Sequence, residues 1–205
     1  MLLLTGTVPM KDLPLQQGVV HFDDRFAIGN GFSVPASELM HCTTAMVAAA
    51  AVACRTLGIE APYAVVAGCL GEGNGSRLLY RFLAEQAEAL HPKVLSLHYL
   101  LPIRLAAEKF IQSFQQWQNK PILIADAGGM YVMKAAGLAR EFDLFTPDPG
   151  EMAFLADPDA IHPAYVRHFI SKVDMTEVPR LIKEAYQHRN ASRVLLVTYP
   201  KSNSG

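Results

Sequence analysis

Short apolar runs alternate with helical patterns along most of this chain, and the alternation restricts the folds open to it. Runs with the character of buried strands occupy residues 2–4, 63–67, 94–97, 121–125, 142–145 and 194–197. Helical patterns occupy residues 37–57, 77–90, 102–117, 129–136, 150–155, 164–170 and 178–188. Strands joined by helical crossovers pair in parallel and are covered on both faces. The sequence therefore predicts an α/β fold, a three-layer sandwich around a mostly parallel central sheet.

One pair of strands departs from this alternation. Residues 18–22 and 25–28 are typical of a hairpin joined at Asp23 and Asp24, and the glycines and asparagine of 29–31 then break the pattern. The 205 residues suffice for one domain with a substantial core, and there is no internal repeat or linker. We expect residues 1–205 to form a single domain.

Composition excludes several classes of protein. Lys and Arg number 18 against 19 Asp and Glu, with no long basic stretch, which disfavours a nucleic-acid binder. The N-terminus lacks the features of a signal peptide, and the alanine-rich run 45–53 is too short to span a bilayer. Three cysteines in apolar surroundings favour reduced thiols, and His162 and His168 lack metal-ligand spacing. We expect a cytoplasmic protein without a membrane segment or metal site.

Three loops follow predicted strands and precede helices, at 68–76, 126–129 and 146–151. Ligands of parallel sheets bind at the carboxyl ends of the strands, where such loops leave for the helices. The first loop is glycine-rich, so its backbone could approach a ligand, and the following helix N-terminus favours anions. It is neither a P-loop nor a dinucleotide fingerprint. Its alternative interpretation is a glycine-rich turn in which Asn74 or Ser76 caps the next helix.

The other two loops carry carboxylates. Asp126 closes an apolar strand, where it could hold a ribose hydroxyl or a metal-bound phosphate, or simply cap the turn that follows. In the string 146–151, Asp148 has the position of an N-cap, Pro149 that of the first helical residue and Glu151 that of N3 in a capping box. This local role and a role in ligand binding are compatible with one another.

These motifs together resemble a known family. Thr146-Pro147-Asp148-Pro149-Gly150-Glu151 resembles the Thr-Pro-His-Pro-Gly-Glu motif of the ADP- or ATP-dependent NAD(P)H-hydrate dehydratases, a branch of the ribokinase superfamily. Residues 124–128 are similar to the Asp-Ala-Asp strand end of that family, and 67–71 stand where it has Gly-Pro-Gly-Leu-Gly. The alanine-rich helix at 43–54 is similar to its first long helix. The motifs occur in the family's order over most of the chain.

The resemblance implies a ribokinase-like sandwich and a set of substrate-binding residues, namely Gly68, Gly71, Asp126, Asp148 and Glu151. It leaves the catalytic residues unassigned. Two departures stand inside the motifs. Asp148 replaces a histidine, which exchanges a neutral or cationic group for an anionic one near pH 7. Cys69 replaces a glycine, which adds a side chain where backbone could otherwise approach a ligand.

A further departure concerns the chemistry. Ribokinase-like enzymes carry a Gly-Thr-Gly-Asp-type anion hole whose aspartate is the catalytic base, and these 205 residues contain no such string. Two interpretations remain open: a fold truncated at the C-terminus, or a non-catalytic derivative that binds ligand.

The resemblance implies three candidate functions. The first is an ATP- or ADP-dependent dehydratase of hydrated NAD(P)H, with Mg²⁺ as a further cofactor. The second is a kinase for a hydroxylated metabolite such as a sugar or vitamin precursor, for which the hairpin at 18–28 would be a candidate lid. The third is the non-catalytic binding protein. The expected partner is in each case a small molecule, and a homo-oligomer is left open.

Overall fold

The structure, a computed structural model, describes residues 1–35, 42–161 and 175–198. The helix predicted at 164–170 and the first residues of the helix predicted at 37–57 lie outside this part. The described strands are β1 (Leu2–Val8), β2 (Gln16–Phe22), β3 (Arg25–Ile28), β4 (Phe32–Pro35), β5 (Tyr63–Gly68), β6 (Val94–His98), β7 (Ile122–Asp126), β8 (Leu144–Phe145) and β9 (Val194–Leu195). The described α-helices are α1 (Cys42–Thr56), α2 (Asn74–Glu85), α3 (Arg104–Gln115), α4 (Gly128–Ala135), α5 (Pro149–Ala156) and α6 (Val178–Gln187).

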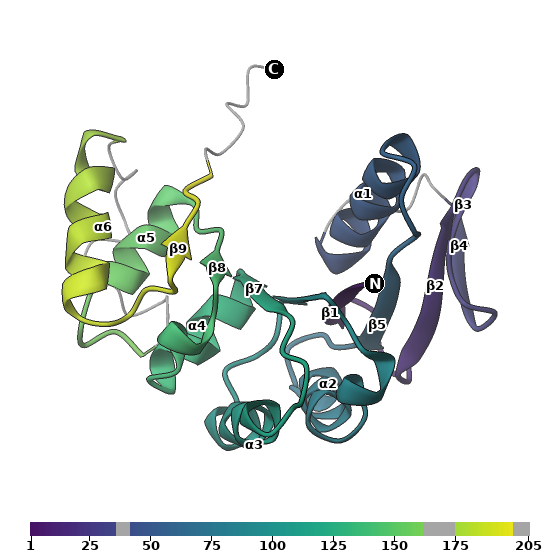
Figure 1. The fold of residues 1–205 in the computed structure, drawn as a ribbon, viewed down its shortest axis with the longest axis horizontal. Helices are drawn as coiled ribbons and strands as arrows, with labels where there is room; N and C mark the ends of the chain where they lie inside the picture. Colours follow the sequence, from purple (N-terminus) through teal and green to yellow (C-terminus); the bar gives the residue numbers. More distant parts are fainter. Residues whose placement is uncertain (36–41, 162–174, 199–205) are drawn as a thin grey trace.

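The strands form one sheet in the order β4-β3-β2-β5-β1-β6-β7-β8-β9 (Figure 1). All pairs from β5 to β9 are parallel, and the pairs that involve β2, β3 and β4 are antiparallel. The prediction of an α/β fold with a mostly parallel sheet is therefore confirmed. The parallel part has helical crossovers, as the alternation of strand and helix patterns required.

The predicted hairpin forms, but it belongs to the main sheet. β2 and β3 pair through Val20 and Ile28, and β2 also pairs with β5. Val20, Phe26 and Ile28 are buried in the core that α1 covers, so the hairpin extends the main sheet. The strand β4 was missed, because only four residues of weak alternation separate the break at 29–31 from residue 36.

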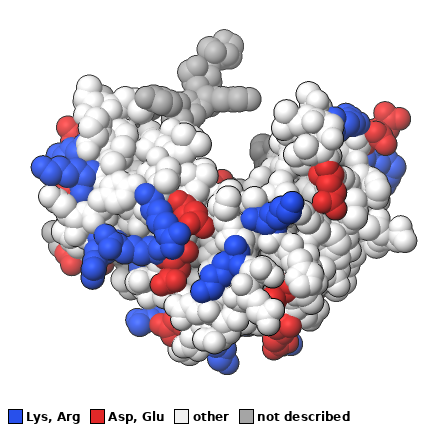
Figure 2. All heavy atoms as spheres, viewed as in Figure 1, with Lys and Arg blue, Asp and Glu red and all other residues white. Residues whose placement is uncertain are grey.

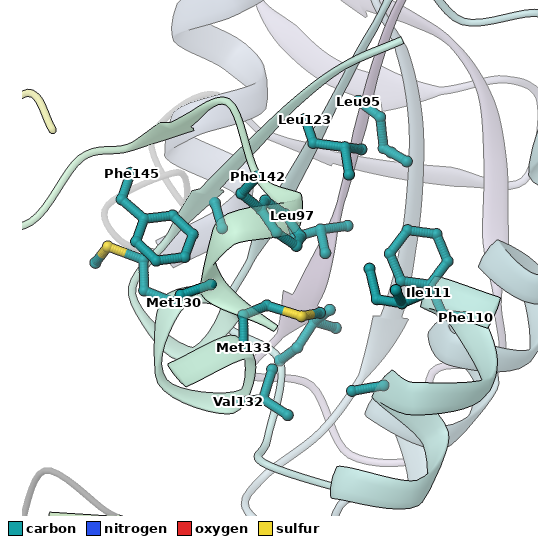
Figure 3. Packing of buried hydrophobic residues seen from close by; sticks show 14 of the residues in the cluster. Leu95, Leu97, Phe110, Ile111, Leu123, Met130, Val132, Met133, Phe142 and Phe145 are labelled. Carbon is teal, nitrogen blue, oxygen red and sulfur yellow. The ribbon is translucent and has the colours of Figure 1, made fainter. Parts of the chain in front are cut away.

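The two faces of the sheet have separate hydrophobic cores. On one face α1 packs against β1 and β2 with Val47, Ala48 and Ala51, whose small volumes bring the helix close. On the other face lies the larger core, to which α2 to α6 all contribute. Figure 3 shows part of it, where leucines of β6 and β7 meet side chains of α3 and α4. Helices on both faces are compatible with the predicted three-layer sandwich.

The α1 side of the sheet is open over its second half. Ile122, Val194 and Leu196 lie on this side, since their neighbours in sequence belong to the core of the other face, and each is more than half exposed. Within the described ranges no helix stands over β7 to β9 on this side (Figure 1). The space-filling view shows the surface hollowed between α1 and the part that holds α5 and α6 (Figure 2).

Several boundaries differ from the predictions. β1 continues to Val8 because Thr5 and Thr7 are accommodated in the sheet by hydrogen bonds from their hydroxyls to the carbonyl oxygens of Ser96 and Tyr99. Helix α2 begins three residues earlier than predicted. None of the helices in the described ranges is long and apolar enough to cross a membrane.

Candidate functional site

The carboxyl ends of the central strands bring two ionisable side chains side by side. His98 is the last residue of β6 and Asp126 the last of β7, and the two are directly paired in the parallel register. Their side chains share the α1 face of the sheet, since Leu97 and Ala125 before them belong to the opposite core. His98 is buried, whereas the Asp126 side chain is 36 % exposed. A ligand at this edge would therefore meet Asp126 with His98 behind it.

His98 is held from both sides of its ring. Its Nδ1 lies 2.9 Å from Thr43 Oγ1 in the first turn of α1, and its Nε2 lies 3.5 Å from Asp126 Oδ2. The other carboxylate oxygen of Asp126 accepts a hydrogen bond of 2.9 Å from the backbone N–H of Ala127. Gly6 on β1 permits this arrangement, because a Cβ there would collide with Thr43 and with the backbone of His98. The cap that the sequence suggested for Asp126 does not form: the N-cap of α4 is Ala127, and Asp126 accepts from the N–H of that adjacent residue.

The next loop supplies two more carboxyl groups. Asp148 caps α5 by accepting from the backbone N–H of Glu151 at 2.7 Å, and Glu151 Oε2 accepts from the backbone N–H of Asp148 at 2.9 Å. The predicted capping box is thus confirmed. Glu151 Oε1 also accepts a hydrogen bond of 2.7 Å from the hydroxyl of Tyr131 on α4. Only one Asp148 oxygen is used by the cap.

The three acids influence one another. Burial raises the pKa of Glu151 to about 7, and the negative charges of Asp148 and Asp126 add to this, while the hydrogen bonds from Asp148 N–H and Tyr131 act against it. Burial, followed by the charge of Glu151, raises the pKa of the Tyr131 hydroxyl, which therefore remains a donor. The sequence-predicted residues Asp126, Asp148 and Glu151 thus lie in one electrostatic cluster with His98 and Tyr131.

The raised pKa of Glu151 predicts a pH dependence of stability. In the unfolded chain its carboxyl has the ordinary glutamate pKa of 4.5, whereas in the fold it keeps the proton until about pH 7. The folded state therefore binds more protons between these values, and its stability falls as the pH rises through them. We expect Glu151→Gln, which can keep the capping box, to remove about 1–2 kcal/mol of this fall, allowing for solvent screening. Urea unfolding at pH 4.5 and 8 measures the fall in the free energy of unfolding of each protein.

The exposed Glu85 of α2 provides the matched control, since Glu85→Gln should leave the pH dependence as in the wild type. If wild type and Glu151→Gln lost stability in parallel between pH 4.5 and 8, the burial of a proton-binding carboxyl at position 151 would be wrong.

The glycines of the first loop lie in another part of the same edge. Gly68 ends β5, which is three strand positions from β7 and so roughly 14 Å from it. Gly68 lines a groove between this loop and residues 10–14, with a volume of about 400 Å³, and Gly71 is not part of its lining. Gly71, at φ +116, needs the freedom of glycine, whereas Gly68 packs against Met10 and Leu13. Gly68 and the loop that carries Gly71 therefore lie apart from the acidic cluster, and only an extended ligand could contact both Gly68 and Asp126.

The start of α2 corrects one prediction. Neither Asn74 nor Ser76 caps the helix: the N-cap is Gly73, which has no side chain to do so. Ser76 instead accepts a hydrogen bond of 3.0 Å from the backbone N–H of Leu101, which links α2 to the segment after β6. The Cys69 thiol, which stands where the resembling family has glycine, accepts from Gly73 N–H at 3.3 Å. The side chain at position 69 thus stabilises the loop itself.

The side chains of the site can be compared with the groups that a metal ion or a nucleotide needs as partners. In the described parts of the chain no three His, Cys, Asp or Glu side chains are placed to hold a metal ion. A Mg²⁺ ion commonly binds through one or two carboxylates together with phosphates and water, and Asp126 is a partly exposed carboxylate at this edge. The groove beside Gly68 contains the acidic Asp12 and Glu72, and for phosphates it offers Lys11 and Asn74. These donors fit phosphate oxygens, and the acidic cluster fits hydroxyl groups.

Four residues of the cluster were missed in the sequence: His98, Thr43, Tyr99 and Tyr131. His98 had a signal, since it is a polar residue directly after an apolar strand run, as Asp126 is. The other three had none, because each is brought in by the packing of a helix or by a turn.

No family model and no solved structure matches the chain. Among curated proteins it is similar to the uncharacterized protein MJ1337 of Methanocaldococcus jannaschii, with 44 % identity over 123 residues. The match covers 60 % of this chain and 48 % of that protein, so the chain spans about half the length of the curated relative that it matches.

Proposed function

We propose that this chain forms the substrate-binding part of a nucleotide-dependent enzyme that acts on a hydroxyl group of a small molecule. The placement of His98 beside Asp126, next to the Tyr131–Glu151–Asp148 network at the carboxyl ends of β6, β7 and β8, is the observation that carries the proposal. Such a crevice is where ligands of parallel sheets bind. The resemblance to the hydrated-NAD(P)H dehydratases names the reaction and the nucleotide, ATP or ADP with Mg²⁺.

The residues have distinct roles in this proposal. The partly exposed Asp126 carboxylate can accept a proton from the substrate hydroxyl, and His98 stabilises it from behind. Asp148 offers its remaining oxygen to a second hydroxyl, and Tyr131 and Glu151 fix the helix that carries it. A bound nucleotide would supply the phosphoryl group that makes the hydroxyl a good leaving group. Lys11 and Asn74 are the described donors suited to its phosphates.

Ligand-induced stabilisation provides the first test. With ATP or ADP at ten times its dissociation constant and Mg²⁺ present, we expect the melting temperature of the 205-residue chain to rise by roughly 3–5 °C. Lys11→Ala should reduce the rise, whereas Lys109→Ala, on the exposed surface of α3, should not. The absence of any rise at millimolar nucleotide would contradict the proposal.

Turnover separates the candidate reactions. Loss of hydrated NADH with nucleotide present would support the dehydratase, and phosphorylation of a sugar or vitamin precursor would support the kinase. We expect Asp126→Asn to lower the rate at least a hundredfold, because its oxygen then no longer accepts the proton. A clear rise in melting temperature with no turnover of either substrate would contradict an enzyme and favour the binding protein.

A further inference from the structure

Tyr99 is an aromatic side chain exposed at the centre of the candidate site. It directly follows His98 at the end of β6, a strand in the middle of the sheet, yet its side chain and backbone together remain 47 % exposed. The His98 ring packs edge-on against it, with centroids 4.4 Å apart and an angle of 83° between the planes. Tyr99 is thus oriented by His98 while part of its surface faces solvent.

The backbone of Tyr99 has a conformation that a bulky residue rarely adopts. Its φ is +49°, in the left-handed region, and Ala127 after Asp126 has φ +47°. Three neighbours keep the turn in place: Thr7 donates to the carbonyl oxygen of Tyr99, Ser76 accepts from Leu101, and Gly128 lets the helix α4 approach Leu100. Glycine or asparagine would fit this backbone better. A tyrosine at this position costs stability, which points to a functional role of its ring.

Acidic side chains surround the Tyr99 ring. Burial raises the pKa of the Tyr99 hydroxyl, and the further contributions all come from acidic groups, namely Cys42, Glu151, Asp126 and Asp148. An anionic ligand group at this ring would be repelled, and a cationic one would be attracted both by the carboxylates and by the negative face of the ring.

We propose that Tyr99 is a specificity-determining residue of this site and that its ring binds a flat, positively charged or electron-poor ring of the ligand. This inference rests on the proposed function, because it names the class of group that the same crevice selects. The ring of the ligand would lie against the exposed surface of Tyr99, within reach of the carboxylates of Asp126 and Asp148, and its phosphates would lie elsewhere.

The test uses three small rings of different charge as probes: 1-methylpyridinium, pyridine and benzoate. NMR titration of the 205-residue chain gives their dissociation constants. We expect 1-methylpyridinium to bind the wild type at least tenfold more tightly than benzoate. Tyr99→Leu should weaken its binding at least fivefold, and Tyr99→Phe should restore it to within twofold, because the phenyl ring keeps the π face. Equal affinities of the leucine and phenylalanine variants, or benzoate binding as tightly as the cation, would overturn the inference.

Stability separates a ligand-binding tyrosine from a structural one. Tyr99→Asn tolerates the left-handed backbone, so its melting temperature should equal or exceed that of the wild type, while 1-methylpyridinium binding is lost. A fall of more than 5 °C would show that the ring serves packing and would count against the proposal.

The failures of the two proposals are distinguishable. If the cation binds through Tyr99 but no nucleotide raises the melting temperature, the nucleotide-dependent function is wrong and the role of Tyr99 stands. If nucleotides bind and the Tyr99 variants leave probe binding unchanged, the role of Tyr99 is wrong and the nucleotide-dependent function stands.

Discussion

Replacing Lys134 with methionine should lower the free energy of unfolding by about 3 kcal/mol. Lys134 is only 6 % exposed, and its ammonium group donates to the carbonyl oxygens of Phe154, Asp157 and Ala160. All three N–H donors of the side chain are thereby used. The group also lies 4.0 Å from the centroid of the Phe154 ring. Methionine fills a similar volume but leaves three carbonyl groups at the end of α5 without this donor.

Lys109→Met is the matched control, since Lys109 is exposed on α3 and its replacement should change stability by less than 0.5 kcal/mol. Urea unfolding followed by circular dichroism measures both variants. A loss below 1 kcal/mol in Lys134→Met would mean that water replaces the ammonium group and that the contacts contribute little.

Gly75→Ala should destabilise the protein by about 2–3 kcal/mol, although helix propensity alone predicts a gain of about 1 kcal/mol. Gly75 lies in the first turn of α2, where the helix crosses the end of β5. A Cβ at this position would collide with the carbonyl oxygen of Gly68 and would lie 2.9 Å from its carbon. Both partners are backbone, so neither can move aside as a flexible side chain could. The helix would have to shift away from the sheet.

Asn74→Ala tests the same helix end without the collision. Asn74 is exposed and does not cap the helix, so this variant should stay within about 0.5 kcal/mol of the wild type. Thermal unfolding of the two variants side by side gives the comparison. If Gly75→Ala proved as stable as Asn74→Ala, the close packing of α2 on β5 would be incorrect.

The parts of the fold that sequence predicted best are those with a local physical cause. The buried strands β5, β6 and β7 are continuous apolar runs between turns, and α5 begins where Asp148 and Glu151 can form a capping box. The end of α1 near the predicted residue 57 also has a local cause, since Gly58 after it has φ +65°. Each of these features depends on a few consecutive residues.

Features that depend on distant residues were harder to predict. Helix α1 meets the sheet through Thr43 and His98, which are 55 positions apart, and Tyr131 reaches Glu151 only because α4 and α5 are neighbours. The glycine-rich loop shows the same difficulty. The sequence alone does not show whether a glycine lets a ligand approach the backbone or, as at Gly68 and Gly75, lets another part of the chain pack closely.

Helix α4 is bonded to α5 at two points. The Tyr131 hydroxyl donates to Glu151 in the first turn of α5, and the Lys134 ammonium group donates to the carbonyl oxygen of Phe154 in its last turn. An eight-residue helix is too short to persist alone, so α5 has no independent freedom to slide or tilt. Since α4 itself starts two residues after Asp126, Asp126 and Asp148 are held in fixed positions relative to each other. Any closure around a substrate must therefore come from α1, which carries Thr43, while α4 and α5 on the side of Asp126 and Asp148 stay rigid.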